Sequence, residues 1–491
     1  MKRSASIILT LAAIISGCTG GPVSQSGEKP SIWPDYTDVT VPADIAPLRF
    51  EAVSGNKMKA LFETAQGQQV RLSGKEIAIP RSDWKRLTAE GGIIKVTLAE
   101  KQDSGTTEYQ PFDIVIAPEG IDSHIAYRLI EPGYEMWNKM GIYQRKLSSF
   151  RQTCIAENSY TEGNCMNCHS FCDRNAGTML FHMRASLSGT YIMRDGELEK
   201  LNTKTPETIS ALVYPSWHPS GRYVAFSVND TKQAFHSTDP NRVEVYDIRS
   251  DVVVYDVENH QVKSCPELFS KESFETFPTF SPDGKTLYVC SSYSLAIPED
   301  YDKVCYNLCS IEFDAENCSF GDKVDTLYRA SKGHSASFPR VSPDGKMLVF
   351  TISGYGNFSI WHKDADLYSF DLEQFTEAKS KGLPAPIPTC MESFNSNDVE
   401  SYHSWSSNSR WLIFSSRRDD GLYTRPYIGY VAPDGTFGKP FLLPARHTKN
   451  YKDLMKSFNI PEFVDAEVSL PAAKLKKASR SKGIDLGFEM Q

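Results

Sequence analysis

The 491-residue chain has no long apolar run after its first twenty residues, so the sequence offers no candidate for a membrane-spanning helix beyond that point. It has no excess of positive charge either, because 53 lysines and arginines stand against 61 aspartates and glutamates, which gives a formal net charge of -8. This balance argues against nucleic acid as the main partner. A nucleophile elbow, a phosphate-binding loop and a paired-carboxylate signature are also missing. The sequence therefore gives no direct sign of catalysis.

The amino terminus has the pattern of an exported lipoprotein. Two basic residues precede a short apolar run over residues 7–15, and small residues lead from that run to Cys18. This pattern resembles the lipobox of bacterial lipoproteins, which implies that Cys18 carries the lipid; an ordinary cleaved secretory signal is the alternative. Each buried methylene contributes roughly 0.8 kcal/mol, so several acyl chains together anchor a protein stably. We therefore expect residues 1–18 to be a lipoprotein signal, residues 19–35 to be a tether, and the protein to be lipid-anchored to the inner or outer membrane of the cell envelope.

Residues 36–125 show short alternating apolar runs that are separated by turn signals. The segments 58–64 and 112–117 are examples. Several short strands without helices between them predict an antiparallel β-sandwich. Residues 126–177 lose this alternation, and we expect them to form a connector.

The second half contains an internal repeat. Three copies place an aromatic or proline-containing segment ahead of a tight turn and follow the turn with an apolar strand, and a fourth copy is degraded. Aligned on the turn, the copies lie at Gly221, Gly284, Gly345 and Ser409, so the spacings are 63, 61 and 64 residues. A repeat of this length holds about four strands, which make one blade of a β-propeller.

The repeated element resembles the PxWSPDG element of TolB-like, WD-repeat-like β-propellers from bacterial envelope proteins. This resemblance implies a propeller of five or six blades over residues 178–465, and a surface that docks other envelope proteins. The predicted fold class is therefore all-β, an N-terminal antiparallel β-sandwich followed by this propeller. The basic tail over residues 466–491 is expected to be poorly ordered.

The sharpest chemical motif lies between the two regions, at Cys165, Cys168 and His169. In an exported protein, CxxCH is the attachment motif of c-type haem, in which two thiols bind the vinyl groups and the histidine is an axial iron ligand. The segment resembles the haem loop of small cytochromes c, so we expect covalent haem c as the cofactor and these three residues as its binding site. Two alternatives stay open: a disulfide between the two cysteines, or a zinc site that adds Cys172 and His182.

A second axial ligand would come from the strand expected over residues 179–184. Alternation places His182 on one face of this strand and Met183 on the other. A thioether ligand would give a higher potential than a second imidazole. We expect His182, with Met183 as the weaker alternative, to complete a metal site around His169.

Together these features predict an envelope-anchored c-type haem protein that serves electron transfer or redox-partner docking through its propeller. One alternative is a redox-silent TolB-like interaction scaffold with a structural CxxC disulfide. A weaker alternative is a propeller lyase or hydrolase that uses channel histidines, namely His218, His334 and His403. On balance the sequence favours a binding or redox protein over an enzyme.

Overall fold

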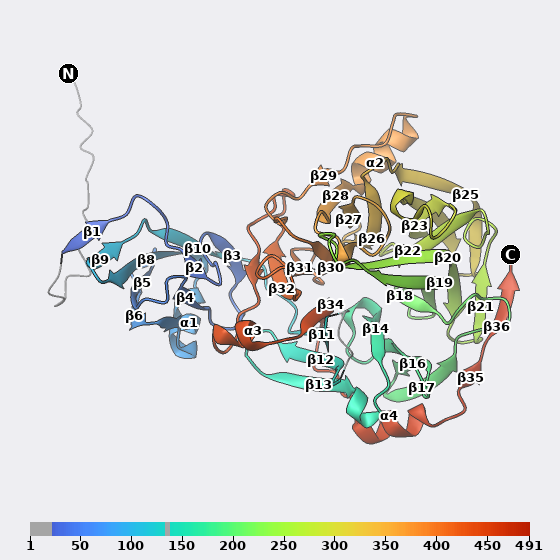
Figure 1. The fold of residues 1–491 in the computed structure, drawn as a ribbon, viewed down its shortest axis with the longest axis horizontal. Coiled ribbons are helices and arrows are strands. Elements are labelled where there is room, and N and C mark those ends of the chain that lie inside the picture. The colour runs from blue at the N-terminus through green and yellow to red at the C-terminus, as the bar shows by residue number, and fades with distance from the viewer. Residues whose placement is uncertain (1–21, 133–137) are drawn as a thin grey trace.

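The computed structural model describes residues 22–132 and 138–491, which form an N-terminal β domain beside a β-propeller (Figure 1). Cys18, the expected lipid acceptor, lies outside these residues. Within the described ranges, no helix is long and apolar enough to cross a membrane.

The N-terminal domain packs a large sheet against a small one. The large sheet contains β1 (Val23–Gln25), β3 (Val39–Pro42), β5 (Met58–Thr64), β6 (Gln69–Gly74), β8 (Gly92–Gln102), β9 (Gly105–Glu108) and β10 (Phe112–Ala117). The small sheet contains β2 (Ile32–Trp33), β4 (Arg49–Ala52) and β7 (Glu76–Ala78), and α1 (Arg81–Thr88) follows it. Most pairs are antiparallel, but β1 with β9 and β3 with β10 are parallel. Alternating apolar residues of both sheets are buried in one core, and that core continues into the adjoining blade of the propeller.

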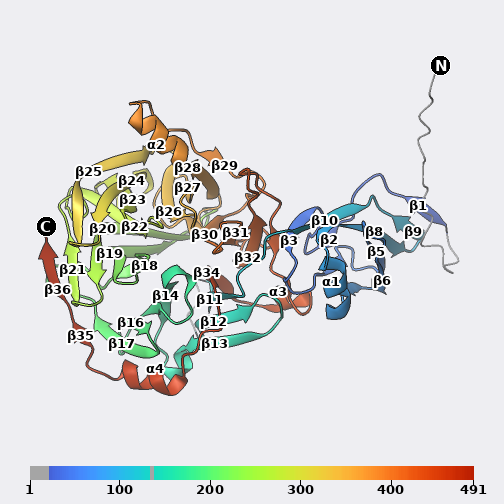
Figure 2. The same cartoon turned by 180° about the vertical axis from the view of Figure 1, so that it is seen from behind.

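The propeller is a ring of six four-stranded blades (Figures 1 and 2). Blade 1 contains β34 (Ser457–Val464), β11 (His124–Ile130), β12 (Gly141–Lys146) and β13 (Gln152–Glu157). Blade 2 contains β14 (Met166–Phe171), β15 (Met179–Met183), β16 (Gly189–Arg194) and β17 (Glu197–Asn202). Blade 3 contains β18 (Val213–Trp217), β19 (Tyr223–Phe235), β20 (Val243–Asp256) and β21 (Gln261–Ser264).

The other three blades follow the repeat along the chain. Blade 4 contains β22 (Ser273–Phe280), β23 (Thr286–Tyr293), β24 (Asn307–Asp314) and β25 (Ser319–Tyr328). Blade 5 contains β26 (Ser335–Val341), β27 (Met347–Ser353), β28 (Asp366–Asp371) and β29 (Thr389–Cys390), with α2 (Leu372–Ser380) between the last two. Blade 6 contains β30 (Glu400–Trp405), β31 (Trp411–Ser416), β32 (Arg425–Tyr430) and β33 (Phe441–Leu442), and α3 (Lys449–Asp453) leads from it to β34.

The first strand named for each blade is the innermost, and neighbouring inner strands contact one another around the ring. The ring is closed by β34, which pairs antiparallel with β11 although more than 300 residues separate them. The all-β fold class is therefore confirmed, and the number of blades is six.

Two segments differ from the sequence expectation. Residues 126–177, expected as a connector, instead supply most of β11 together with β12, β13 and the inner strand β14. These strands lack the turn motif of the other blades, and they are held by pairing with their neighbours in the sheet. The tail, expected to be poorly ordered, folds as α4 (Ala472–Ser479), β35 (Ile484–Asp485) and β36 (Gly487–Met490). It is held because β35 and β36 add parallel fifth strands to blades 2 and 3, and Phe488 packs against the blade 3 core.

Candidate functional site

Every inner strand contains one non-glycine residue in the left-handed region, with φ between 49° and 51°. These six residues are Cys168, Tyr214, Phe277, Phe338, Tyr402 and Ile460. The pairing register of each inner strand shifts at this point. Left-handed backbone costs an ordinary residue roughly 1–2 kcal/mol, so the surrounding blade must hold it in place.

The aromatic members of this set close the channel midway. The ring centroids of Tyr214 and Phe277 are 4.7 Å apart, those of Phe277 and Phe338 3.9 Å, and those of Phe338 and Tyr402 4.8 Å. We call this ring of six residues the plug. It divides the channel into a mouth, at the carboxyl ends of the inner strands, and a second end.

The CxxCH sequence is part of this same repeat. The residue after the left-handed one is proline in four blades and histidine in two, His169 and His403. Cys168-His169-Ser170-Phe171 is therefore the blade 2 equivalent of Tyr402-His403-Ser404-Trp405 in blade 6. The propeller repeat accounts for the Cys-His pair without a cofactor.

The geometry at this motif does not fit a covalently attached haem. Cys165, Cys168 and His169 are only 8%, 6% and 1% exposed, and the cavity beside Cys168 and His169 measures about 20 Å³. That volume holds about one water molecule. Burial lowers the pKa of His169 to about 3, although backbone groups of Ile460 and Ala126 act in the opposite direction.

The expected second ligands face elsewhere. His182 pairs in register with Asn167, and its Nδ1 lies 3.3 Å from the Thr190 hydroxyl. Burial also lowers the pKa of His182 to about 3. Met183 is fully buried in the core between blades 1 and 2. Strand alternation thus places His182 and Met183 on opposite faces, as predicted, but neither meets His169 at a metal site.

The alternatives to haem also lack their sites. Cys165, Cys168 and Cys172 are free thiols. Among the described residues, no three His, Cys, Asp or Glu side chains are arranged to hold a metal ion.

The three histidines considered for catalysis do not meet in the channel. The His403 ring lies 2.9 Å from the Val349 carbonyl of blade 5, and the His218 ring 3.1 Å from the Gly284 carbonyl of blade 4. Both rings therefore bridge neighbouring blades. His334 is exposed in a surface turn.

The mouth of the channel is the site that the structure builds instead. It is a cavity of about 170 Å³, to which all six inner strands contribute. Two rings of side chains line it. The inner ring, two residues after each plug residue, contains Ser170, Ser216, Thr279, Arg340, Ser404 and Glu462. The outer ring, one residue further on, contains Phe171, Trp217, Phe280, Val341, Trp405 and Phe463.

Arg340 and Glu462 interrupt a ring that is otherwise made of hydroxyls. Arg340 Nη1 donates to the Pro339 carbonyl at 2.8 Å, and no described carboxylate lies within ion-pair distance of its guanidinium. Burial lowers the pKa of Arg340, although Glu462 acts in the opposite direction. Glu462 accepts from the Phe171 backbone N–H at 3.1 Å, and burial raises its pKa to about 8. The Ser404 hydroxyl beside them is buried without a partner.

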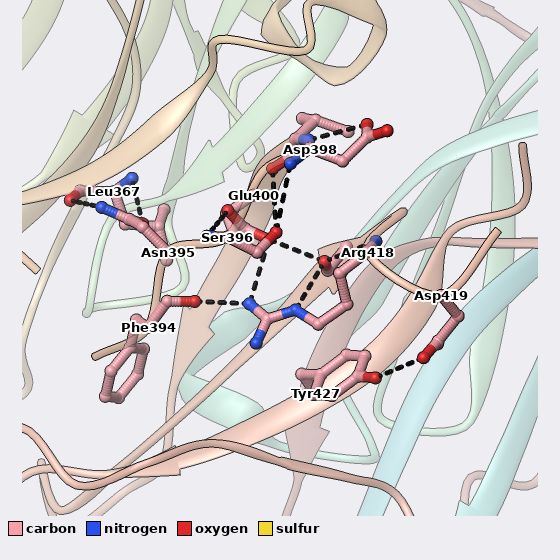
Figure 3. A network of polar contacts seen from close by, with 11 residues as sticks. Leu367, Phe394, Asn395, Ser396, Asp398, Glu400, Arg418, Asp419 and Tyr427 are labelled. Atoms are coloured by element: carbon pink, nitrogen blue, oxygen red, sulfur yellow. Dashed lines mark hydrogen bonds and ion pairs between the residues drawn. The ribbon is translucent and has the colours of Figure 1, made fainter. Parts of the chain in front are cut away.

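A charge pair in blade 6, between Glu400 and Arg418, contrasts with the charged residues of the mouth (Figure 3). Glu400 accepts from Arg418 at 3.0 Å and from the hydroxyls of Ser396 and Ser416 at 2.7 Å each. Arg418 Nε also donates to the Ser416 hydroxyl at 3.0 Å. Both charges there are satisfied within the chain, whereas Arg340 faces a cavity.

Sequence reasoning missed Arg340 and Glu462. A signal was present, since the repeat carries a hydroxyl residue at this position in four blades and a charged residue in two. That departure becomes visible only when all six copies are aligned, and two copies lack the turn motif that identifies the others.

Comparisons with known proteins find distant structural likenesses. No family model and no curated protein matches the sequence. Among solved structures, the chain is similar to a puromycin-hydrolysing peptidase of Mycobacterium tuberculosis, with 12% identity and a TM-score of 0.36 over 86% of this chain and 57% of that one. It is also similar to the β-propeller domain of the Trilobed protease from Pyrococcus furiosus, with 11% identity and a TM-score of 0.30 over 69% and 79%. A third is prolyl oligopeptidase B from Galerina marginata, with 9% identity and a TM-score of 0.34 over 81% and 54%. The chain thus spans a little over half the length of the first of these.

The prediction of a c-type haem electron-transfer protein is wrong. The CxxCH residues are a buried copy of the propeller repeat, and the cavity of about 20 Å³ beside them has no room for a macrocycle.

Proposed function

We propose that this chain is a lipid-anchored envelope protein whose propeller binds a small carboxylate-bearing ligand in the mouth of its channel. The observation that carries the proposal is Arg340, a guanidinium at a cavity with one hydrogen bond to its own chain and no described acid partner. The lipobox resemblance at Cys18 supports the location.

The charge of the mouth favours an anion. Arg340 is only partly buried, so a ligand can reach its guanidinium, and a ligand carboxylate can accept two parallel hydrogen bonds from one guanidinium. Arg174 also lines the cavity, where it pairs with Asp173. Because the pKa of Glu462 is raised to about 8, this carboxyl is largely protonated at neutral pH and can donate a hydrogen bond to the same ligand.

The size and walls of the mouth favour an aromatic or short aliphatic acid. A cavity of roughly 150 Å³ takes a benzene-sized molecule, which is close to the volume here. Trp217 and Trp405 lie in the outer ring, and their indole N–H groups already donate to the carbonyls of Ser170 and Arg340. Their ring faces are therefore held in place to pack against the apolar part of a ligand.

Isothermal calorimetry with benzoate and benzyl alcohol tests this proposal. We expect benzoate to bind more tightly, and Arg340→Met to weaken benzoate binding about 30-fold, as expected for a lost charged hydrogen bond of ~2 kcal/mol. Arg410→Met is the matched control, because Arg410 pairs with Asp344 outside the cavity. Equal binding of the two compounds, or full benzoate binding by Arg340→Met, would contradict the proposal.

The pH dependence provides a second test. Ionisation of Glu462 as the pH rises through about 8 places a negative charge beside the ligand carboxylate, so benzoate affinity should fall above pH 8. Glu462→Gln should bind benzoate with the same affinity at pH 7 and pH 9. For the location, Cys18→Ala should move the protein out of the membrane fraction and abolish labelling by a fatty-acid probe.

A further inference from the structure

Blade 3 carries an extension that covers the second end of the channel. β19 and β20 are the longest strands of the propeller and pair over thirteen positions (Figure 1). Their far halves and the loop that joins them extend beyond the inner strand, and we call this segment, residues 229–250, the flap. The flap lies opposite the mouth, because β19 runs antiparallel to β18 and extends past the beginning of that strand.

The flap is fastened to the neighbouring blades. The Tyr246 ring stacks on Tyr301 of blade 4 with centroids 5.1 Å apart. The Tyr355 hydroxyl of blade 5 donates to Glu244 at 2.6 Å, and the Lys363 backbone N–H donates to Asn241 at 3.1 Å. The flap thus reaches from blade 3 across blade 4 to blade 5.

Its most buried fastening is Asp247. One carboxylate oxygen, Oδ2, accepts from the Asn229 amide at 2.8 Å and from the Asn357 amide at 2.6 Å. The other oxygen, Oδ1, has no partner, and neither has Asn229 Oδ1. Asp247 is 4% exposed and Asn229 7%. A proton on Asp247 Oδ1 can bond to Asn229 Oδ1 and satisfy both, which closes a two-bond ring between a carboxylic acid and an amide.

No positive charge competes for Asp247. The groups that face it are Asp230 on β19, Tyr214 on β18 and Tyr306 before β24. Three residues away, Glu244 faces His236, His362 and Tyr355. No described lysine or arginine lies within ion-pair distance of Asp247. Burial, with a further contribution from Asp230, therefore raises the pKa of Asp247 to about 7.

The same fastening reaches the plug. Phe358 follows Asn357 and packs against two plug residues, with ring centroids 5.8 Å from Tyr214 and 6.1 Å from Phe277. Release of Asn357 from the flap therefore also loosens a ring that helps to close the channel.

We propose that the flap is a gate over the second end of the channel, latched by the acid–amide ring between Asp247 and Asn229, and that ionisation of Asp247 opens it. Opening moves the loop that carries Asn357 and Phe358, and so gives the channel a second entrance whose use depends on proton concentration. The gate stands on the flap geometry and is independent of what binds in the mouth.

Hydrogen exchange of the flap, followed by mass spectrometry and corrected for intrinsic rates, tests the gate. In the open flap Asp247 has its ordinary carboxyl pKa, whereas in the closed flap its pKa is about 7. Between these two pH values the equilibrium constant for opening should grow about tenfold per pH unit, and above pH 7 it should level off. Between pH 5 and pH 7 the protection of residues 229–250 should therefore fall roughly 50-fold. Asp247→Asn can still accept and donate hydrogen bonds at this position but carries no charge, so its flap should show the same protection at both pH values.

Two further variants complete the design. Asn229→Leu removes the amide and should leave the flap unprotected at both pH values. Glu275→Gln is the control, because Glu275 is a buried acid of blade 4 outside the flap, and it should keep the wild-type response. A pH response that persists in Asp247→Asn would overturn the gate. So would protection at pH 7 by added Ca²⁺, since the unpartnered oxygens would then hold a cation rather than share a proton.

Discussion

Glu275 is the buried acid whose replacement should change stability most clearly. It lies on β22 and is 1% exposed, and Oε1 accepts from the Ser291 hydroxyl at 3.0 Å. The Ser273 hydroxyl also acts on this carboxyl and opposes the effect of burial, and no described lysine or arginine is within ion-pair distance. Burial raises its pKa from the ordinary value of 4.5 to about 8, and Asp251 acts in the same direction.

The sign and size of the effect follow from linkage. Below pH 4.5 the carboxyl is protonated in both the folded and the unfolded chain, so it imposes no cost. Between pH 4.5 and 8 the unfolded chain releases the proton and the folded chain keeps it, so the free energy of unfolding falls by about 1.36 kcal/mol per pH unit. The full interval corresponds to about 5 kcal/mol, and above pH 8 the curve levels off. The side-chain amide introduced by Glu275→Gln imitates the protonated acid at every pH.

Urea unfolding of wild type and Glu275→Gln at half-unit steps from pH 4.5 to 9 measures this difference. We expect the two proteins to be equally stable near pH 4.5 and the variant to be more stable by about 3–5 kcal/mol at pH 8, because some relaxation around the ionised group reduces the full cost. Ser291→Ala, which removes only the neighbouring hydroxyl, is the control and should not flatten the pH profile. A stability difference that does not vary with pH would refute the reasoning, since it would show that Glu275 is already ionised in the folded chain.

Three other changes test the structural assignments. His169→Pro should alter the free energy of unfolding by less than about 1 kcal/mol, because four blades carry proline at this position, whereas loss of more than ~3 kcal/mol would assign the imidazole a role of its own. Deletion of residues 484–491 should lower the urea midpoint by the equivalent of about 3 kcal/mol, since it exposes the half-buried Phe488 and the edges of two blades. An unchanged midpoint would mean that this segment is not held in solution. Arg418→Met should cost about 3 kcal/mol by leaving Glu400 buried without its cation, and the double variant with Glu400→Gln should recover part of that loss; additive losses would contradict the pairing in Figure 3.

The repeat could be predicted from the sequence because its signals are local. A Pro-Asp-Gly turn followed by an apolar strand marks blades 4 and 5, and the related turn at Gly221 marks blade 3. Blade 1 could be counted only ambiguously. Its closing strand, β34, carries Ile460-Pro461-Glu462-Phe463 but has no glycine turn after it, because its partner β11 comes from the other end of the propeller. Such a long-range pairing has no local signature.

The haem prediction failed for a related reason. The motif matches a haem-attachment sequence, but it also matches the propeller repeat of its own chain. Cys165 and Cys168 have the spacing of a haem site, yet φ of 51° at Cys168 is shared with five other plug residues, and His169 occupies the proline position. The Cys-His pair is therefore explained by the backbone geometry that repeats in all six inner strands, and not by haem attachment through its side chains.

The same geometry is the reason that we propose the mouth as the ligand site of this propeller. Six equivalent backbones aim six side chains, each two residues beyond the plug, at one cavity. Hydroxyls at all six positions would give a neutral ring with no preference for a charged ligand. Arg340 and Glu462 break that symmetry at ring positions separated only by Ser404, the first with a guanidinium and the second with a carboxyl whose pKa burial raises to about 8. Glu462 also joins two blades, because it accepts from the Phe171 backbone N–H of blade 2, whereas the Arg340 guanidinium donates to the Pro339 carbonyl of its own strand. Under the proposed function, Arg340 is therefore the group that gives the mouth its preference for a carboxylate.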